Sequence, residues 1–189
     1  MTGRSPSFLR RRRRLAVWAM ALGLLAPAPA AAVGYVFFFS VLGEWAVTCS
    51  LDEPTGLSSC TLGAPPPVQD DARSLLSITE EGANAFTVKV RVLGLNAPRR
   101  PLFLGVDENP PHQAWPDRYG EASWDGAAAG VIVGQMKTGL HLHLRSFVEA
   151  PGTPKDETFS LAEFAKALAL FRAKLRAHGI IASGKAEIR

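Results

Sequence analysis

The stretch LGEWAVTCSLDEPTGLSSCTL, Leu42 to Leu62, contains both cysteines of this 189-residue chain. Ten residues separate Cys49 from Cys60, so the pair has neither the C-x-x-C spacing of a thioredoxin-like redox site nor the paired spacing of a zinc site. In an oxidising compartment, two cysteines on adjacent strand ends most simply form one disulfide. The sequence therefore predicts a structural disulfide between Cys49 and Cys60, with a redox pair and free or intermolecular thiols as the alternatives.

The N-terminal 32 residues have the order of a secretory signal. Arg10 to Arg14 are five consecutive arginines, an uncharged run rich in Leu, Ala, Val and Trp begins at Leu15, and the small-residue stretch APAPAAA follows. Basic, then apolar, then small residues are typical of an export signal, and the paired arginines also match a twin-arginine signal. We expect cleavage after Ala30 or Ala32, which delivers the remaining chain to the periplasm or cell envelope.

The uncharged run continues past this expected cleavage site. No charged residue occurs from Leu15 to Gly43, and the segment VGYVFFFSVLG, Val33 to Gly43, is strongly apolar. About 20 apolar residues suffice to span a bilayer, so residues 15–43 can also form an uncleaved membrane anchor with its arginines on the cytoplasmic side. The segment that begins at Tyr35 is therefore expected either to be buried as a first strand or to stay in the membrane.

The charge balance argues against nucleic acid as a partner. The net charge is +4 and the isoelectric point is near 9.4, but the leader carries six of the 21 Lys and Arg residues and none of the 17 acids. Residues 33–189 therefore hold 15 basic and 17 acidic side chains, a net charge of −2. They show no basic patch with interleaved aromatic residues. The positive charge is expected to serve export.

Residues 33–189 have the usual size of one domain, and their hydrophobic pattern is mostly that of strands. AFTVKVRV (85–92) alternates apolar and polar residues, and with SLLSIT (74–79) it predicts a hairpin. Further strands are predicted in PLFLGV (101–106), VIVGQM (131–136) and GLHLHLRSF (139–147). Alternation in the last of these places Leu140, Leu142 and Leu144 on one face, opposite His141, His143 and Arg145. Short strands separated by Gly- and Pro-rich turns predict a mainly β protein, an antiparallel β-sandwich-like domain.

One amphipathic helix is predicted near the C-terminus, in FSLAEFAKALALFRAKL (159–175). Ser160 and Glu163 have the spacing of a capping box. A single apolar stripe is formed by Leu161, Phe164, Ala165, Leu168, Phe171 and Leu175. We expect this stripe to pack on the sheet.

The segment DENPPHQAWPDRYGEASWDG (107–126) is predicted to be a long loop. It carries Trp115, Tyr119 and Trp124 among acidic residues. Long loops inside compact domains are commonly functional, and exposed aromatic residues are common anchors of interfaces. The three aromatic residues are therefore our candidate partner-binding residues, for an unidentified protein or envelope component. The alternative is that they fold back over the sheet as a lid.

The sequence contains no catalytic motif that we recognise, so we expect a non-enzymatic protein without a cofactor or a metal ion. No serine lies in a G-x-S-x-G elbow, and no phosphate loop or dinucleotide fingerprint is present. His141 and His143 share a strand face, and His112 lies in the long loop. A periplasmic hydrolase or metal-dependent enzyme is the alternative, and it requires these three side chains to converge.

Three motifs, taken in order, resemble one protein family: GEWAVTC with the cysteine of SSCTL, then GQMKTGLHLHLRS, then TFSLAEFAKAL. The chain is similar here to the invasion-associated locus B family of exported bacterial proteins. The matching positions are Trp45, Cys49 and Cys60, then Lys137 and Gly139, then Ser160, Leu161, Phe164, Ala167 and Leu168. The resemblance spans residues 43–170.

The resemblance implies an exported, mostly β domain at the envelope, linked in some bacteria to entry into host cells and without an assigned reaction. Two features depart from the family pattern. Many members carry a second cysteine pair in mid-chain, which this chain lacks, and Glu163 stands where the family has glycine. The expected function is an envelope protein-interaction module, with an N-terminally anchored accessory subunit of a membrane complex as a further alternative.

Overall fold

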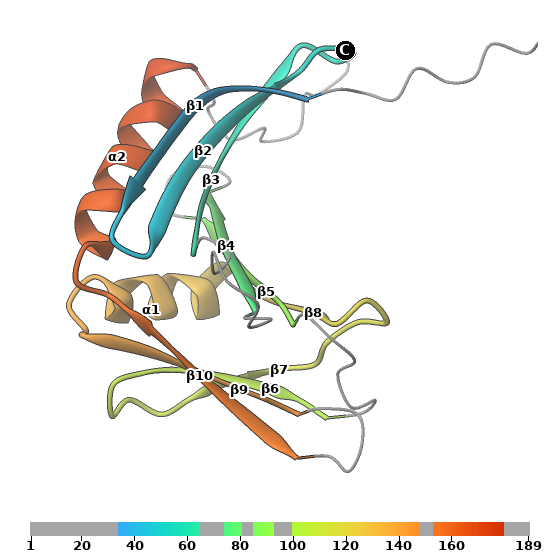
Figure 1. Ribbon diagram of the computed structural model, residues 1–189, viewed down its shortest axis with the longest axis vertical. Helices are drawn as coiled ribbons and strands as arrows, with labels where there is room; N and C mark the ends of the chain where they lie inside the picture. The colour runs from blue at the N-terminus through green and yellow to red at the C-terminus, as the bar shows by residue number, and fades with distance from the viewer. Residues whose placement is uncertain (1–33, 65–73, 81–84, 93–99, 148–152, 180–189) are drawn as a thin grey trace, which may run out of the picture. The chain divides into compact units, whose positions relative to one another are not determined.

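The computed structural model describes five ranges of the chain, residues 34–64, 74–80, 85–92, 100–147 and 153–179. All of them belong to one unit, Val33–Arg189. The signal peptide or anchor predicted for residues 1–32 lies outside the described residues. Within these ranges the elements are strands in two antiparallel sheets together with two helices, α1 and α2 (Figure 1).

The larger sheet has six strands in the order β1-β2-β3-β4-β5-β8. Their bounds are β1 Gly34–Leu42, β2 Trp45–Asp52, β3 Leu57–Ala64, β4 Leu75–Glu80, β5 Phe86–Arg91 and β8 Glu121–Asp125. The predicted hairpin is confirmed as β4 and β5, which pair from Leu75↔Arg91 to Glu80↔Phe86. The predicted alternation is also confirmed, because Phe86, Val88 and Val90 are buried.

The smaller sheet has four strands in the order β10-β9-β6-β7. Their bounds are β10 Pro154–Ser160, β9 His141–Phe147, β6 Leu102–Val106 and β7 His112–Ala114. Strands β6 and β9 were predicted from their apolar residues, which point inward: Leu102, Leu104, Leu142 and Leu144 are each at most 1 % exposed. Leu140, which the alternation also placed with them, precedes β9 and is exposed.

Helix α2, Phe164–Ala177, covers one face of β1, β2 and β3 (Figure 1). Its buried stripe consists of Phe164, Ala167, Leu168, Phe171 and Leu175. Packing on the sheet is confirmed, but the stripe contains Ala167 in place of the predicted Ala165, which is exposed.

The predicted capping box of α2 is wrong. Ser160 is the last residue of β10, and its backbone N–H donates to the Glu44 carboxylate at 2.9 Å. The Ser160 hydroxyl accepts a hydrogen bond from the N–H of Ala162. Glu163 is the residue before the helix, makes no capping hydrogen bond, and pairs with Lys166. The helix therefore begins only at Phe164, because Ser160 still belongs to strand β10.

The predicted strand in VIVGQM is also wrong, because these residues end helix α1, Gly126–Met136. The buried residues of α1 are Ala129, Ile132, Val133 and Met136. Their spacing follows the helical period of three to four residues. Three consecutive alanines near the start favour the helix, but its three glycines disfavour it. Burial of this face therefore stabilises the helix more than local propensity does. Helix α1 contacts β5 and β8 of the larger sheet and β6 of the smaller one.

The apolar segment after the expected cleavage site forms strand β1, as expected for Tyr35 onward, but the expected burial is wrong: Tyr35, Val36, Phe39 and Val41 are 49 to 62 % exposed. It pairs with β2 from Gly34↔Asp52 to Leu42↔Trp45. Phe37 and Phe38 pack partly against the core. Among the helices of the described ranges, none is both long and apolar enough to cross a membrane.

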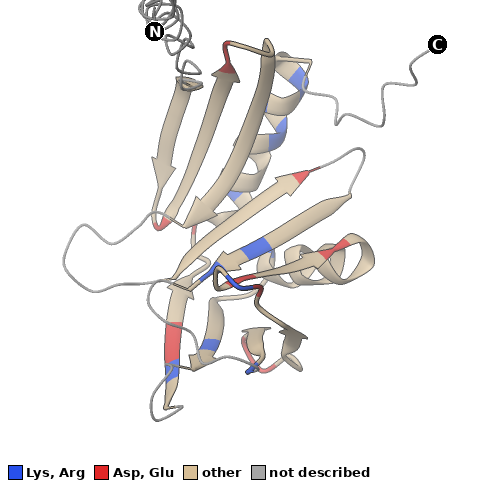
Figure 2. Cartoon of the chain, turned by 90° about the vertical axis from the view of Figure 1, so that its right-hand side faces the viewer, with Lys and Arg blue, Asp and Glu red and all other residues tan. Residues whose placement is uncertain are grey.

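The buried side chains of both sheets and both helices form one apolar cluster. Trp45 lies in it with no exposed surface, stacks edge-on against Phe164 at 4.7 Å between ring centroids, and donates its indole N–H to the carbonyl of Ser160 at 2.8 Å. Charged residues are sparse along β1, β2 and β3 and lie near the strand ends (Figure 2). The predicted mainly β antiparallel class with a packed C-terminal helix is confirmed.

Candidate functional site

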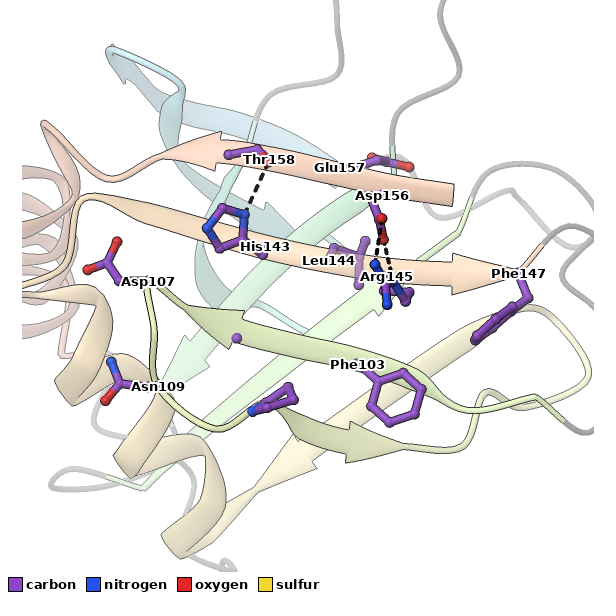
Figure 3. A pocket seen from close by; sticks show the side chains of 12 residues that line it. Phe103, Asp107, Asn109, His143, Leu144, Arg145, Phe147, Asp156, Glu157 and Thr158 are labelled. Carbon is purple, nitrogen blue, oxygen red and sulfur yellow. Dashed lines mark hydrogen bonds and ion pairs between the residues drawn. The ribbon is translucent and has the colours of Figure 1, made fainter. Parts of the chain in front are cut away.

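A groove of about 580 Å³ lies on the outer face of the smaller sheet. Strands β6, β9 and β10 and the β6–β7 turn supply its lining. Figure 3 shows polar side chains at one end of the groove and phenyl rings at the other. The residues used below are Phe103, Asp107, His143, Arg145, Phe147 and Asp156.

The strand register places three groove residues in one row across the sheet. Phe103 on β6 is directly opposite Arg145 on β9, and Arg145 is opposite Asp156 on β10. Residues directly opposite each other lie on the same face of a sheet. Their sequence neighbours Leu104, Leu144 and Glu157 form the matching buried row. Alternate residues of the same three strands therefore line the groove on one face and the core on the other.

Arg145 and Asp156 form a two-point ion pair at the centre of the groove (Figure 3). The guanidinium Nε and Nη2 atoms donate to the two carboxylate oxygens at 2.6 and 2.8 Å. This hydrogen bonding lowers the pKa of Asp156 and raises the pKa of Arg145. More than half of each side chain is exposed, so the pair presents hydrogen-bonding groups to a ligand and adds little to stability.

Asp107 holds the polar end of the groove in place. It has a positive φ of 48° and accepts hydrogen bonds from the backbone N–H groups of Leu140 and His141, the latter at 2.8 Å. These bonds lower the pKa of the Asp107 carboxyl, the one from His141 most strongly. The carboxylate thus fixes the start of β9 against the end of β6 and remains ionised near neutral pH.

Two phenyl rings form the apolar end. Phe103 and Phe147 are each half-buried and line the groove from β6 and β9. The Arg100 guanidinium lies over the Phe147 ring at 5.1 Å from its centroid. Sequence analysis did not identify these two rings or the Arg145–Asp156 pair, although alternation in the β9 sequence already placed Arg145 on the wet face. The charged β10 sequence was not recognised as a strand.

The three histidines of the enzyme hypothesis do not share one face. His143 lies opposite Gly105 on the groove face, and its Nδ1 is 3.2 Å from the hydroxyl of Thr158. His112 lies opposite the buried Leu104, which places it on the other face of the sheet. The His141 and His143 rings are 6.1 Å apart. Within the described ranges, no group of three or more His, Cys, Asp or Glu residues is arranged to hold a metal ion.

The three aromatic residues predicted to bind a partner are in different environments. Trp124 belongs to β8 and is only 5 % exposed, so the prediction of a surface contact is wrong for this residue. Trp124 does not belong to a lid either, because β8 is itself a strand of the larger sheet. Trp115 is 61 % and Tyr119 is 67 % exposed, as a binding role requires. The predicted loop 107–126 is itself interrupted by β7 and β8.

A tight turn presents Tyr119 to solvent. The Asp117 carboxylate accepts the backbone N–H groups of Tyr119 at 2.8 Å and of Glu121 at 3.0 Å. These two bonds lower the pKa of Asp117. The Arg118 guanidinium stacks over the Tyr119 ring, 4.7 Å from its centroid. Trp115 directly follows β7, the edge strand beside the Phe103 strand.

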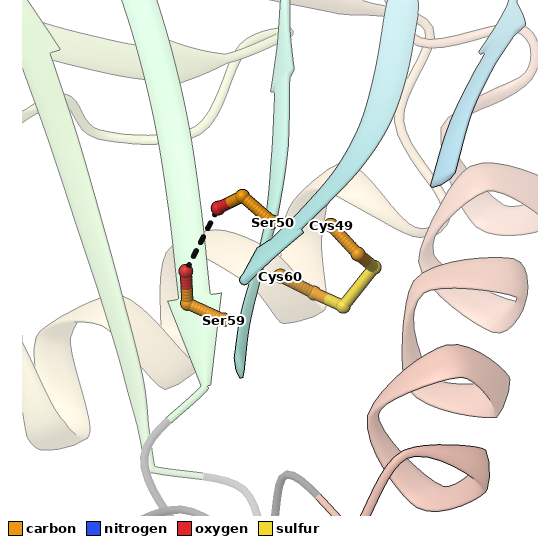
Figure 4. Close-up of a disulfide and its surroundings, with 4 residues drawn as sticks. All are labelled: Cys49, Ser50, Ser59 and Cys60. Atoms are coloured by element: carbon orange, nitrogen blue, oxygen red, sulfur yellow. Dashed lines mark hydrogen bonds between the residues drawn. A yellow bond between two sulfur atoms is a disulfide. The ribbon is translucent and has the colours of Figure 1, made fainter. Parts of the chain in front are cut away.

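The predicted disulfide is present between Cys49 on β2 and Cys60 on β3 (Figure 4). The two residues are directly opposite in the β2–β3 pair, and both are buried. On the exposed face, the next pair in the ladder, Ser50 and Ser59, has its hydroxyl groups 3.3 Å apart. The bond therefore joins neighbouring strands within the core, which is a structural position.

These features define a class: a small β-rich domain with two antiparallel sheets, an early disulfide between neighbouring strands and a closing helix. No protein-family model matches the chain, and no curated protein matches it by sequence. The same fold occurs in the crystal structure of invasion associated protein B from Bartonella henselae, with a TM-score of 0.59 and 18 % sequence identity. The match covers 74 % of this chain and 99 % of that one. The resemblance seen in the sequence is thus confirmed for the fold.

Proposed function

We propose that this protein is an exported, non-enzymatic envelope protein that binds a partner protein in the groove of the smaller sheet. The observation that carries the proposal is the exposed row of Phe103, Arg145 and Asp156, with Phe147 beside it. Aromatic residues and arginine are the side chains most enriched where proteins bind proteins. A half-exposed ion pair beside two phenyl rings offers a partner both apolar contact area and oriented hydrogen bonds.

Export is supported by the leader sequence and by the disulfide. Disulfides persist in oxidising compartments and are rare in the cytosol. The Cys49–Cys60 bond therefore fits a domain that acts outside the cytoplasm. The intact mass of protein from an envelope fraction tests this location. A mass starting near Ala31 or Val33 supports cleavage, a mass that includes the arginines supports an anchored protein, and a mass that does not rise on reduction contradicts the disulfide.

The protonation state of two groove acids speaks against a general-acid role for them. A general acid or base works best when its pKa lies near the working pH. Hydrogen bonds lower the pKa of Asp107 and of Asp156, so both stay ionised at neutral pH and neither is suited to donate a proton. Asp156 is also neutralised by Arg145. These two acids are thus better suited to accept hydrogen bonds from a ligand than to donate a proton to one.

Site-directed photo-crosslinking tests the binding proposal. A photoreactive residue is placed at Phe103 or Phe147, and in a control at Val131, an exposed apolar residue of α1. We expect both groove positions, and not the control, to crosslink one envelope protein. Arg145→Gln, which removes the positive charge without placing two carboxylates opposite each other, should abolish that crosslink with little change in the melting temperature. Equal labelling at Val131, or a crosslink that survives Arg145→Gln, would contradict the proposal.

Trp115 and Tyr119 remain proposed contacts for the same partner. Both are exposed, so replacing them with alanine should leave stability unchanged. If the partner extends past β7, crosslinking from the groove should weaken in the Trp115→Ala variant. An unchanged crosslink yield in both variants would confine the binding surface to the groove.

A further inference from the structure

The two open sheets leave four edge strands, and three of these edges carry the usual protection against pairing with another chain. Short length, proline and charged side chains are such protections. Strand β7 has only three residues, and β8 carries an acid at each end, Glu121 and Asp125. Strand β10 begins with Pro154, followed by Lys155 and Asp156.

The fourth edge, β1, lacks these protections over most of its length. It has nine residues, Gly34–Leu42, without a proline or a charged side chain. Four exposed large apolar residues lie on this one strand: Tyr35, Val36, Phe39 and Val41, which are 49 to 62 % exposed. An exposed apolar edge of this length is an open template for a further strand.

The outer edge of β1 has no hydrogen-bonded neighbour among the described residues. The strand lies at the end of the sheet order and pairs only with β2. No backbone hydrogen bond outside the β1–β2 ladder involves it within the described ranges. Its one irregularity is a bulge between Val36 and Phe38, after which the register is regular to Leu42. The segment Phe38–Leu42 is therefore the part able to accept another strand.

The sheet face beside this segment is uncharged as well. Phe39 lies opposite Thr48, which lies opposite Thr61 on β3, and all three are on the face turned away from α2. The next row, Val41 and Ala46, is apolar. Figure 2 views this face and shows charged residues on β1, β2 and β3 only near the strand ends. Neither the edge nor its face thus repels an identical surface.

We propose that a second copy of this chain pairs with the first along β1, with the two Phe38–Leu42 segments antiparallel about a two-fold axis. A two-fold contact brings each surface against itself, so it tolerates no uncompensated charge. Antiparallel pairing along β8 would bring the acids at its two ends together, whereas β1 itself carries no charged side chain. The Lys174 ammonium of α2 lies over the Phe38 ring at 3.8 Å from its centroid, on the opposite face from Phe39 and Val41. Phe39 and Val41 of each copy are then covered, and the free backbone groups of both edges are paired.

Sedimentation velocity of the full chain, purified from the fraction in which it accumulates, tests this proposal over a range of concentrations. We expect a concentration-dependent species of twice the monomer mass. The Phe39→Lys, Val41→Lys variant should be monomeric at every concentration, since two lysines on each edge would repel. Ser123→Lys, on edge strand β8, is the matched control and should dimerise like the parent.

Two further measurements keep the test decisive. The melting temperature of the double variant should equal that of the dissociated parent, because both replaced side chains are about half or more exposed. In the dimer, hydrogen exchange should slow at residues 38–42 and not in β8. A parent that stays monomeric, or a dimer that survives the double substitution, would overturn the proposal. So would a monomer that binds phosphatidylcholine–phosphatidylglycerol vesicles through β1, which would identify a bilayer as the occupant.

Discussion

The two sheets use their side chains differently. The larger sheet turns Trp45, the Cys49–Cys60 bond and the valines of β5 into the core, and helix α2 covers one face. The smaller sheet also buries one face, but its outer face carries the Arg145–Asp156 pair and the groove. The difference suggests that the larger sheet holds most of the stability, while the smaller one presents the recognition chemistry.

Replacing Trp45 with alanine should lower the free energy of unfolding more than any other substitution predicted below. The side chain is fully buried, contacts Phe164 and hydrogen-bonds to Ser160 in β10. Removing a buried tryptophan typically lowers the free energy of unfolding by about 3–5 kcal/mol. Urea denaturation measures this loss. Trp115→Ala, which removes an exposed ring, should change the free energy by less than about 0.5 kcal/mol. Similar losses for both tryptophans would contradict the assigned burial.

Replacing both cysteines with alanine should have the second largest effect. Cys49 and Cys60 are 11 positions apart, and closing a loop of this size stabilises the folded state by about 3 kcal/mol in the chain-entropy model. The double variant should unfold at lower urea concentration and keep groove crosslinking under native conditions. If crosslinking falls more steeply than the folded fraction, the disulfide also shapes the binding site, and the division between the sheets fails.

The smaller sheet contains one buried carboxylate that contacts the larger sheet, that of Glu157. Its carboxylate accepts the backbone N–H of Ser74 at 2.7 Å and the Ser74 hydroxyl at 2.9 Å, and it pairs with Lys155. Ser74 directly precedes β4 of the larger sheet, so this contact joins the two sheets. Glu157→Gln leaves a buried N–H without its charged acceptor and should lower the free energy of unfolding by roughly 1–3 kcal/mol.

Asp156→Asn is the matched control for Glu157→Gln. It removes a carboxylate one residue away on the same strand, and that carboxylate is largely exposed. Equilibrium unfolding should therefore distinguish the two variants, with Glu157→Gln clearly the less stable. The crosslinking assay should show the reverse order, since Asp156 lines the groove opposite Arg145. Two variants of equal stability would show that the buried contact with Ser74 does not hold the sheets together.

Sequence patterns predicted the parts of the fold that depend on local alternation. The hairpin of β4 and β5, the strands β6 and β9, and the disulfide all follow from residues close together in the chain. Helix α1 was missed because a short apolar run with β-branched residues suits a buried strand equally well. Strand β10 was missed because it buries only Glu157 and Phe159, and its other residues are one proline and charged or polar side chains.

The groove could not be predicted from local patterns. Phe103, Arg145 and Asp156 come from three strands, and only the register of those strands places them in one row. The sequence likewise does not distinguish Trp115 from Trp124, because both lie in the same polar segment. The structure separates Trp124 from Trp115 because β8 pairs with β5 and turns Trp124 toward the core, beside Val88.

The smallest predicted effect concerns Asp107 and depends on pH. Its pKa in the folded protein lies below the usual value of 3.8 because the N–H groups of His141 and Leu140 donate to the carboxylate. The carboxylate therefore stabilises the fold fully above about pH 4, and this contribution is lost as the pH falls through the lowered pKa. Asp107→Asn should have a lower melting temperature than the parent at pH 7, and the difference should shrink below pH 4.

Asparagine is the informative replacement at this position because it tolerates a positive φ nearly as well as aspartate does. Asp107→Ala adds a cost of backbone conformation, and that cost does not change with pH. The two variants should therefore differ by a constant amount from pH 7 to pH 2. The gap between each variant and the parent should narrow by the same amount on the acid side, and Asp107→Ala should keep its backbone cost. If the parent and Asp107→Asn keep the same separation at every pH, the carboxylate charge does not hold β9 against β6, and the groove end is fixed by the backbone alone.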